Sequence, residues 1–127
     1  MITTPPLRLL QLPDIVIIAC RQLDTTPEEL RERCLDAHNR IVVIKAVIAY
    51  YARLYTPASW SEIAVAISPD DTTSTSRHAY ARVERELANE GGEGGDGPYT
   101  RAARLMDAAC ARAVTIKIER AKMGTSL

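Results

Sequence analysis

The chain has 127 residues, the length of one globular domain with a buried core. Apolar residues make up 46% of the chain and charged residues 25%, a composition that favours a folded domain over a disordered one. Basic and acidic side chains number 16 each, and this balance excludes a uniformly basic nucleic-acid coat protein.

Signals for export or membrane insertion are missing from the expected places. The N-terminal residues do not show the basic region and apolar run of a secretory signal. The longest apolar stretch, residues 41–52, contains Lys45 and falls short of the ~20 residues of a membrane span. We therefore expect an intracellular, cytoplasmic protein without a membrane partner.

Charge alternates in sign along the chain. Residues 1–39 carry a net charge of −2 and residues 40–83 a net charge of +2. Residues 84–97 carry −4, and residues 98–127 carry +4. Because charges are screened over a Debye length of about 8–10 Å, a partner responds to these local fields rather than to their sum.

The residues that bind metals or carry catalysis are sparse. Cys20, Cys34 and Cys110 are odd in number and widely spaced, which suits neither a disulfide framework nor a zinc site. The two histidines, His38 and His78, are too few for a four-ligand cluster of ordinary spacing. We expect three free thiols buried on helices, no metal, no cofactor and no small-molecule ligand. We expect no enzyme, because no set of nucleophile, base and orienting group can be written.

Every long segment has the apolar spacing of an α-helix, which predicts an all-α domain. The helix ending at Tyr55 is apolar over nearly its whole circumference, so we expect it to be the central, most buried helix. The expected helices cover residues 13–23, 27–35, 36–55 (with a start between 36 and 39), 60–67, 72–89 and 98–122.

Two helix starts carry strong capping signals. Thr26 is followed by proline and then by Glu29, three residues after the cap. Ser59 and Glu62 form the S-x-x-E capping box, so we expect Glu62 to cap a helix rather than to act as a catalytic acid. Trp60, between them, is expected to anchor the core.

Five of the six glycines lie in residues 91–97, which predicts a flexible linker. The expected organisation is a helical domain at residues 7–90, the linker, and a C-terminal helix at 98–123. We expect a chain that ends at Asn89 to stay folded. The last helix is expected to dock on the core or to pair with a second copy in a homo-oligomer, or to offer a second basic surface for nucleic acid.

A short helix at 60–67, a tight turn at 68–71 and a longer helix from Thr72 or Thr73 have the outline of a helix-turn-helix motif. Such a motif places its second helix in the major groove of DNA, with the N-terminal end leading. The same outline is also ordinary helix packing, so it does not by itself predict DNA binding.

AYYARLYT (49–56), SWSEI (59–63), DTTS (71–74) and HAYARVE (78–84) follow one another in the chain. With these motifs, residues 27–84 resemble the C-terminal DNA-binding domain of the bacterial replication initiator DnaA, a Trp-repressor-like helical domain. Lys45 with AYYARLYT (49–56) is similar to the helix of that family that starts with a basic residue and ends in an Ala-Arg-x-Leu-Thr-like string. SWSEI (59–63) resembles Ser-Leu-Pro-Glu-Ile, and DTTS (71–74) with HAYARVE (78–84) resembles the Asp-His-Thr-Thr and His-Ala-x-x-Lys-Ile-Glu signature. The sequence departs from the family where Asp70 replaces an arginine and Thr72 a histidine.

The motif and the resemblance together predict one set of residues that contact DNA. Short hydroxyls at the start of the second helix suit base edges, and the cationic side chains suit phosphates. The alternatives are that the hydroxyls only cap the helix, that His78 packs in the core, and that the arginines are solvated charges paired with acids. The candidate DNA contacts are Lys45, Arg53, Asp71, Thr72, Thr73, Ser74, Arg77, His78 and Arg82.

From these observations we expect a DnaA-C-terminal-like domain that binds double-stranded DNA, with sequence specificity, and that carries no ATPase. The resemblance implies a prokaryotic or phage protein linked to replication or its regulation. The alternative is a helical protein–protein interaction module of the same fold that does not bind DNA.

Overall fold

The computed structural model describes residues 10–31, 40–67, 73–89 and 97–125. All regular elements among them are helices, which confirms the predicted all-α class. In chain order they are α1 (Leu12–Gln22), α2 (Pro27–Arg31), α3 (Arg40–Tyr55), α4 (Trp60–Ile67), α5 (Thr73–Ala88) and α6 (Pro98–Thr125).

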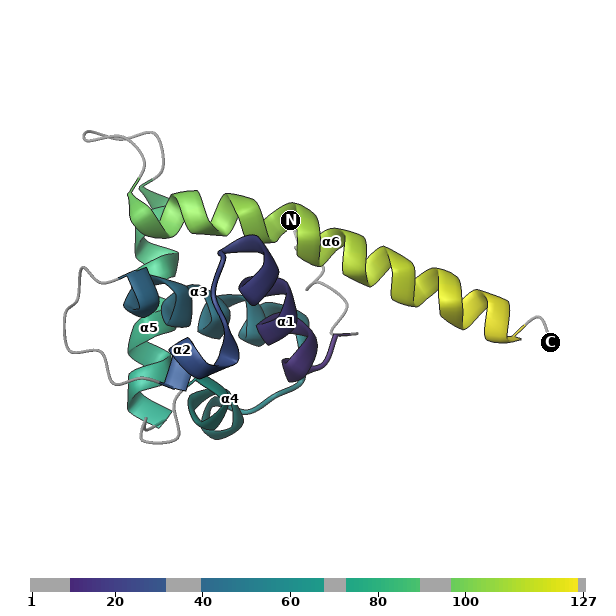
Figure 1. The fold of residues 1–127 in the computed structure, drawn as a ribbon, viewed down its shortest axis with the longest axis horizontal. Coiled ribbons are helices and arrows are strands. Elements are labelled where there is room, and N and C mark those ends of the chain that lie inside the picture. The colour runs from purple at the N-terminus through teal and green to yellow at the C-terminus, as the bar shows by residue number, and fades with distance from the viewer. Residues whose placement is uncertain (1–9, 32–39, 68–72, 90–96, 126–127) are drawn as a thin grey trace.

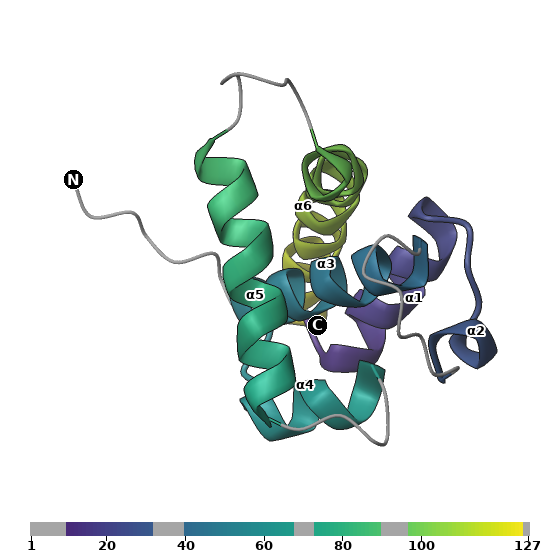
Figure 2. The same ribbon diagram turned by 90° about the vertical axis from the view of Figure 1, so that its left-hand side faces the viewer.

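Helix α3 is the centre of the molecule, as its sequence predicts. Nine of its sixteen residues are buried, from Ile41 near its start to Ala52 near its end. Figure 2 shows α5 on one side of α3 and α1 on the other, with α6 and α4 at opposite ends of α5. A helix covered on most sides must be apolar around most of its circumference. This explains why the apolar residues of α3 are not confined to one face.

Both predicted caps are formed. The amide of Glu29 donates to the Thr26 hydroxyl at 3.2 Å. The amide of Glu62 donates to the Ser59 hydroxyl and the amide of Ser59 donates to the Glu62 carboxylate, each at 3.1 Å. This reciprocal pair fixes the start of α4 at Trp60, where the sequence places it.

The first half of α6 belongs to the main core. Its Ala102, Ala103, Met106 and Cys110 are buried in one hydrophobic cluster with the residues of α1, α3 and α5. Figure 1 shows that the C-terminal half of α6 then projects beyond the helices that its first half covers. Of the alternatives that the sequence left open for this helix, its first half docks on the core. Residues 90–96, where the linker is expected, lie outside the described part of the chain.

Two polar contacts hold α6 against α5 and α1. At its start, the Glu86 carboxylate on α5 accepts hydrogen bonds from the Thr100 amide at 2.6 Å and the Thr100 hydroxyl at 3.0 Å. Farther along, Lys117 pairs with Asp14 of α1 at 3.0 Å. Burial alone would raise the pKa of Asp14, but the hydrogen bond from Gln11 and the charge of Lys117 outweigh it and hold the pKa below its ordinary value.

The cysteines that the structure describes are free: Cys110 is buried and Cys20 is half-buried. Burial raises the pKa of the Cys110 thiol to about 12, which makes it unreactive at neutral pH. Cys34 lies outside the described residues. Among the helices that are described, none has the length and apolar character to cross a membrane.

Candidate nucleic-acid interface

Helices α4 and α5 pack directly against each other, and α4 runs across the end of α5 where that helix begins (Figure 2). The buried Ser76 hydroxyl on α5 donates to the Trp60 carbonyl oxygen on α4 at 3.1 Å. Ile63, Ala64 and Ile67 of α4 are buried beneath this contact. The start of α5 is therefore fixed on the start of α4, and Ser76 serves packing rather than base contact.

Helix α5 has one face in the core and a cationic face toward solvent. Ser76 and Val83 are fully buried, seven residues apart and so on one side of the helix. On the opposite side His78, Arg82 and Arg85 are exposed, at the i, i+4 and i+7 positions of a single stripe. The alternative that His78 packs in the core is therefore wrong.

Exposed Arg77 lies at the edge of this face, about a hundred degrees around the helix from His78. Within the described part of the chain, no carboxylate forms an ion pair with Arg77, Arg82 or Arg85. The outward arginines are thus not neutralised by the described acids. We call Arg77, His78, Arg82 and Arg85 the cationic face of α5.

Arg85 was not among the residues nominated from the sequence. Its signal was present, since it lies three residues after Arg82 and seven after His78. The signature of the resembling family ends at Glu84, one residue before it, and so does not include it.

A cluster of aromatic rings joins α3, α4 and α5 beside this face. Tyr80 of α5 stacks on Tyr50 of α3 with 5.1 Å between ring centroids. It also makes a T-shaped contact with Trp60 of α4, with 5.4 Å between ring centroids. Two guanidinium groups adjoin the same indole: Arg53 Cζ lies 4.7 Å from the ring centroid of Trp60, and Arg77 Cζ lies 6.0 Å from it. Trp60 is half-buried, so it anchors this cluster while part of it remains open to solvent.

The remaining nominated residues have different positions. Lys45 lies eight residues before Arg53 on α3, about 12 Å along the helix axis, and is half-buried. The structure therefore does not bring it to the Trp60 cluster. Asp71 and Thr72, and also Asp70, lie outside the described residues. Thr73 and Ser74 begin α5, but the structure does not describe their side chains.

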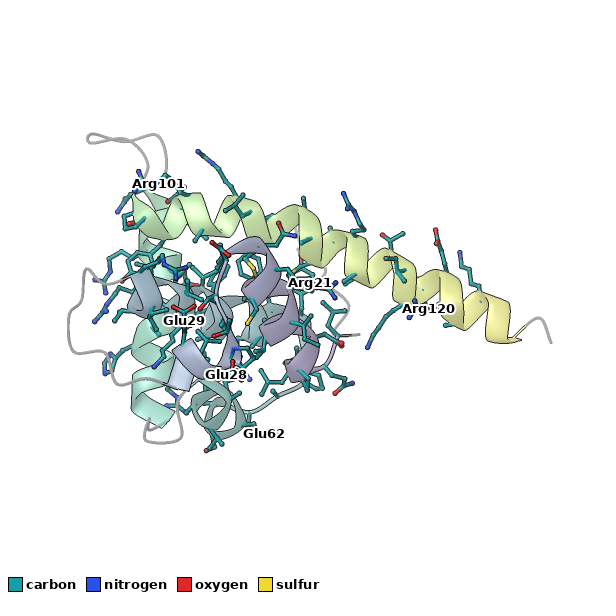
Figure 3. The ribbon with its side chains drawn as sticks, viewed as in Figure 1. Arg21, Glu28, Glu29, Glu62, Arg101 and Arg120 are labelled. Carbon is teal, nitrogen blue, oxygen red and sulfur yellow. The ribbon has the colours of Figure 1, made fainter. Side chains whose placement is uncertain are left out.

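Glu84 borders the site, whereas Glu62 serves the cap of α4. Glu84 is exposed on α5 and accepts a hydrogen bond from Tyr80. Burial raises the pKa of Tyr80, and the charge of Glu84 raises it further, whereas nearby Arg53 lowers it. Figure 3 shows Glu62 pointing away from α4 into solvent. Its hydrogen bonds with Ser59 hold its pKa below the ordinary value, which agrees with a capping role.

The described residues offer no cluster of three or more histidine, cysteine, aspartate or glutamate side chains that could hold a metal ion. Comparisons of the chain with protein-family models, with curated proteins and with solved structures find no match.

Proposed function

We propose that this protein binds duplex DNA through the cationic face of α5, without enzymatic activity of its own. The observation that carries the proposal is the stripe of His78, Arg82 and Arg85, which is exposed and forms no ion pair with a described carboxylate. Exposed arginines along one side of a helix can contact the phosphates that border a groove, and the imidazole beside them can form hydrogen bonds there.

The contact set revises the one nominated from sequence. Arg82 and Arg85 project from α5, while Arg53 and Arg77 adjoin Trp60 at its edge. Each arginine that meets a phosphate releases counterions, and four such contacts give a plot of log K against log salt a slope of roughly −3 to −4. A slope near zero contradicts the proposal.

The test is a titration of labelled random-sequence duplex at several salt concentrations. The double variant Arg82→Gln/Arg85→Gln removes two charges from the proposed face and should flatten the slope by about two units. The matched control is Arg21→Gln, which removes an exposed arginine from α1 on the other side of α3 (Figures 2 and 3). The control should bind DNA as the unaltered chain does.

The resemblance to the DnaA C-terminal domain supports a more specific version of this proposal. In that version the protein is a prokaryotic or phage factor that recognises a defined DNA sequence in replication or its regulation. Repeated selection from a random duplex library tests it, because a sequence-specific protein enriches one site and a purely electrostatic binder enriches none.

A protein-interaction module is the second candidate, and α6 carries the observation that favours it. Leu105 is 52% exposed and Ile116 is 40% exposed on this helix, and large apolar side chains at the surface are what a partner helix buries. Light scattering of the purified chain distinguishes a monomer from a homo-oligomer. Loss of an oligomer in Ile116→Glu would support this candidate.

A further inference from the structure

We propose that Arg53 and Arg77 hold one phosphate group of the DNA backbone between them, with Trp60 as the wall that positions both guanidinium groups. This assignment rests on the proposed function, because it names the ligand of one part of that surface. We call these three residues the Arg53–Trp60–Arg77 site.

The site brings two positive charges from different helices to one ring. Arg53 belongs to the last turn of α3, and Arg77 follows the first turn of α5. Their Cζ atoms lie 4.7 Å and 6.0 Å from the indole centroid of Trp60. Neither guanidinium pairs with a carboxylate among the described residues. Two positive charges near one ring attract an anion more strongly than either charge does alone.

The Trp60 ring also orders the two arginine side chains before an anion binds. A guanidinium over an aromatic face is attracted by the ring electrons, which limits the rotamers it explores. The main chain of Trp60 is held by the hydrogen bond from the Ser76 hydroxyl to its carbonyl oxygen, and its ring makes a T-shaped contact with Tyr80. Part of the entropy of ordering these arginines is therefore lost during folding rather than during binding. Arg82 and Arg85 have no aromatic contact in the described structure and do not share this advantage.

The chemistry of the pair favours phosphate. Guanidinium groups bind phosphate oxygens through two parallel hydrogen bonds, and phosphate has enough oxygens to accept from two arginines at once. The site also adjoins the start of α5, a sixteen-residue helix whose N-terminal end carries partial positive charge. The same DNA strand that meets Arg82 and Arg85 would continue past this site.

Trp60 is the only tryptophan in the chain, so its fluorescence reports on this site alone. The experiment titrates the full chain with random-sequence duplex and follows both tryptophan emission and the anisotropy of labelled DNA. We compare the unaltered chain with Arg53→Gln, Arg77→Gln, their double variant, and Arg82→Gln. Thermal melting of each variant shows whether it remains folded.

We expect DNA to change the Trp60 emission of the unaltered chain with the same midpoint as the anisotropy. Arg53→Gln and Arg77→Gln should each weaken binding about tenfold and flatten the salt slope by about one unit. In the double variant the emission change should vanish while anisotropy still reports weaker binding. Arg82→Gln should also lose about one unit of slope but keep the emission change, because its charge lies outside the site.

A conservative variant separates phosphate binding from a packing role. Arg53→Lys keeps the charge but cannot form two parallel hydrogen bonds to phosphate. Its salt slope should therefore equal that of the unaltered chain, while its affinity stays as low as that of Arg53→Gln. If the unaltered chain, Arg53→Gln and Arg77→Gln bind DNA with the same salt slope and the same change in Trp60 emission, the assignment is overturned. DNA binding itself then still stands. If the unaltered chain does not bind DNA at all, the proposed function fails and the assignment fails with it.

Discussion

The Tyr51 hydroxyl of α3 lies 2.9 Å from the main-chain carbonyl oxygen of Ala103 on α6, although the two residues are 52 positions apart. The same hydroxyl makes a hydrogen bond with the Asp107 carboxylate one turn farther along α6. Tyr51 is only 1% exposed. This buried polar contact fixes the register of α6 against α3, which is the position of α6 along its own axis. Apolar packing alone does not select one register.

Replacing Tyr51 with phenylalanine tests this contact. Tyr51→Phe keeps the ring but removes the hydroxyl, and we expect the free energy of unfolding to fall by about 1–2 kcal/mol. The measurement is urea unfolding followed by circular dichroism. Tyr55→Phe is the control, since the described residues offer its hydroxyl no hydrogen bond. Equal effects of the two variants would show that the Tyr51 hydroxyl contributes nothing specific.

The same contact predicts a loss of stability at alkaline pH. Burial raises the pKa of Tyr51 above its ordinary value of 10.0, and the hydrogen bond with Asp107 raises it further. A group whose pKa is raised by folding contributes its stability below its unfolded pKa and loses it as the pH rises. The difference in stability between the unaltered chain and Tyr51→Phe should therefore shrink as the pH rises above 10. A difference that stays constant in that range contradicts the prediction.

Local signals made the helices predictable from the sequence. The reciprocal bonds of Ser59 and Glu62 need only residues three apart, and the start of α4 is found where they place it. The central position of α3 follows from the apolar residues around its circumference.

Contacts between distant helices could not be predicted in this way. Glu86 caps a helix that begins twelve residues later, and the glycine-rich stretch between them indicates separation rather than contact. Tyr51 is one apolar-looking position among many on α3, and nothing near it in sequence identifies Asp107 as its partner. The cluster of Arg53, Trp60 and Arg77 likewise depends on three helices meeting. Such contacts follow from the packing angles of the helices, which a periodic pattern does not define.

The role of α6 in the core predicts the outcome of shortening the chain. A chain that ends at Asn89 loses the buried Ala103, Met106 and Cys110, and truncating a single buried methionine already costs about 2–5 kcal/mol. We expect this chain to lose cooperative thermal melting, contrary to the expectation drawn from the sequence. A chain that ends at Ile118 keeps the core residues and the Lys117–Asp14 ion pair and should melt like the full chain. Cooperative melting of the Asn89 chain would show that α6 is dispensable.

Gly97 precedes α6 at a point where a side chain would displace the Glu86 carboxylate. A Cβ atom added at Gly97 would lie 2.0 Å from Glu86 Oε1, and the backbone of Gly97 is not in the left-handed region. Gly97→Ala therefore acts by moving Glu86 away from Thr100, and the loss of this cap should destabilise the protein by about 1–2 kcal/mol. In a Glu86→Ala background the same change should cost little. Additive effects in this double-mutant cycle would contradict the mechanism.

The capping box at the start of α4 predicts a specific response to acid. Hydrogen bonds with Ser59 hold the pKa of Glu62 below its ordinary value of 4.5. A carboxylate whose pKa is lowered by folding contributes its full stability above its unfolded pKa and loses it as the pH falls through its folded pKa. Glu62→Gln should therefore unfold at lower urea concentration than the unaltered chain at pH 7, and the difference should disappear as the pH falls below 4.5.

Ser59→Ala removes the other half of the box and should cost about 1 kcal/mol at pH 7. Exposed Glu119→Gln on the projecting part of α6 is the matched control and should not change stability at either pH. A Glu62→Gln difference that persists unchanged in acid would mean that the carboxylate does not cap α4.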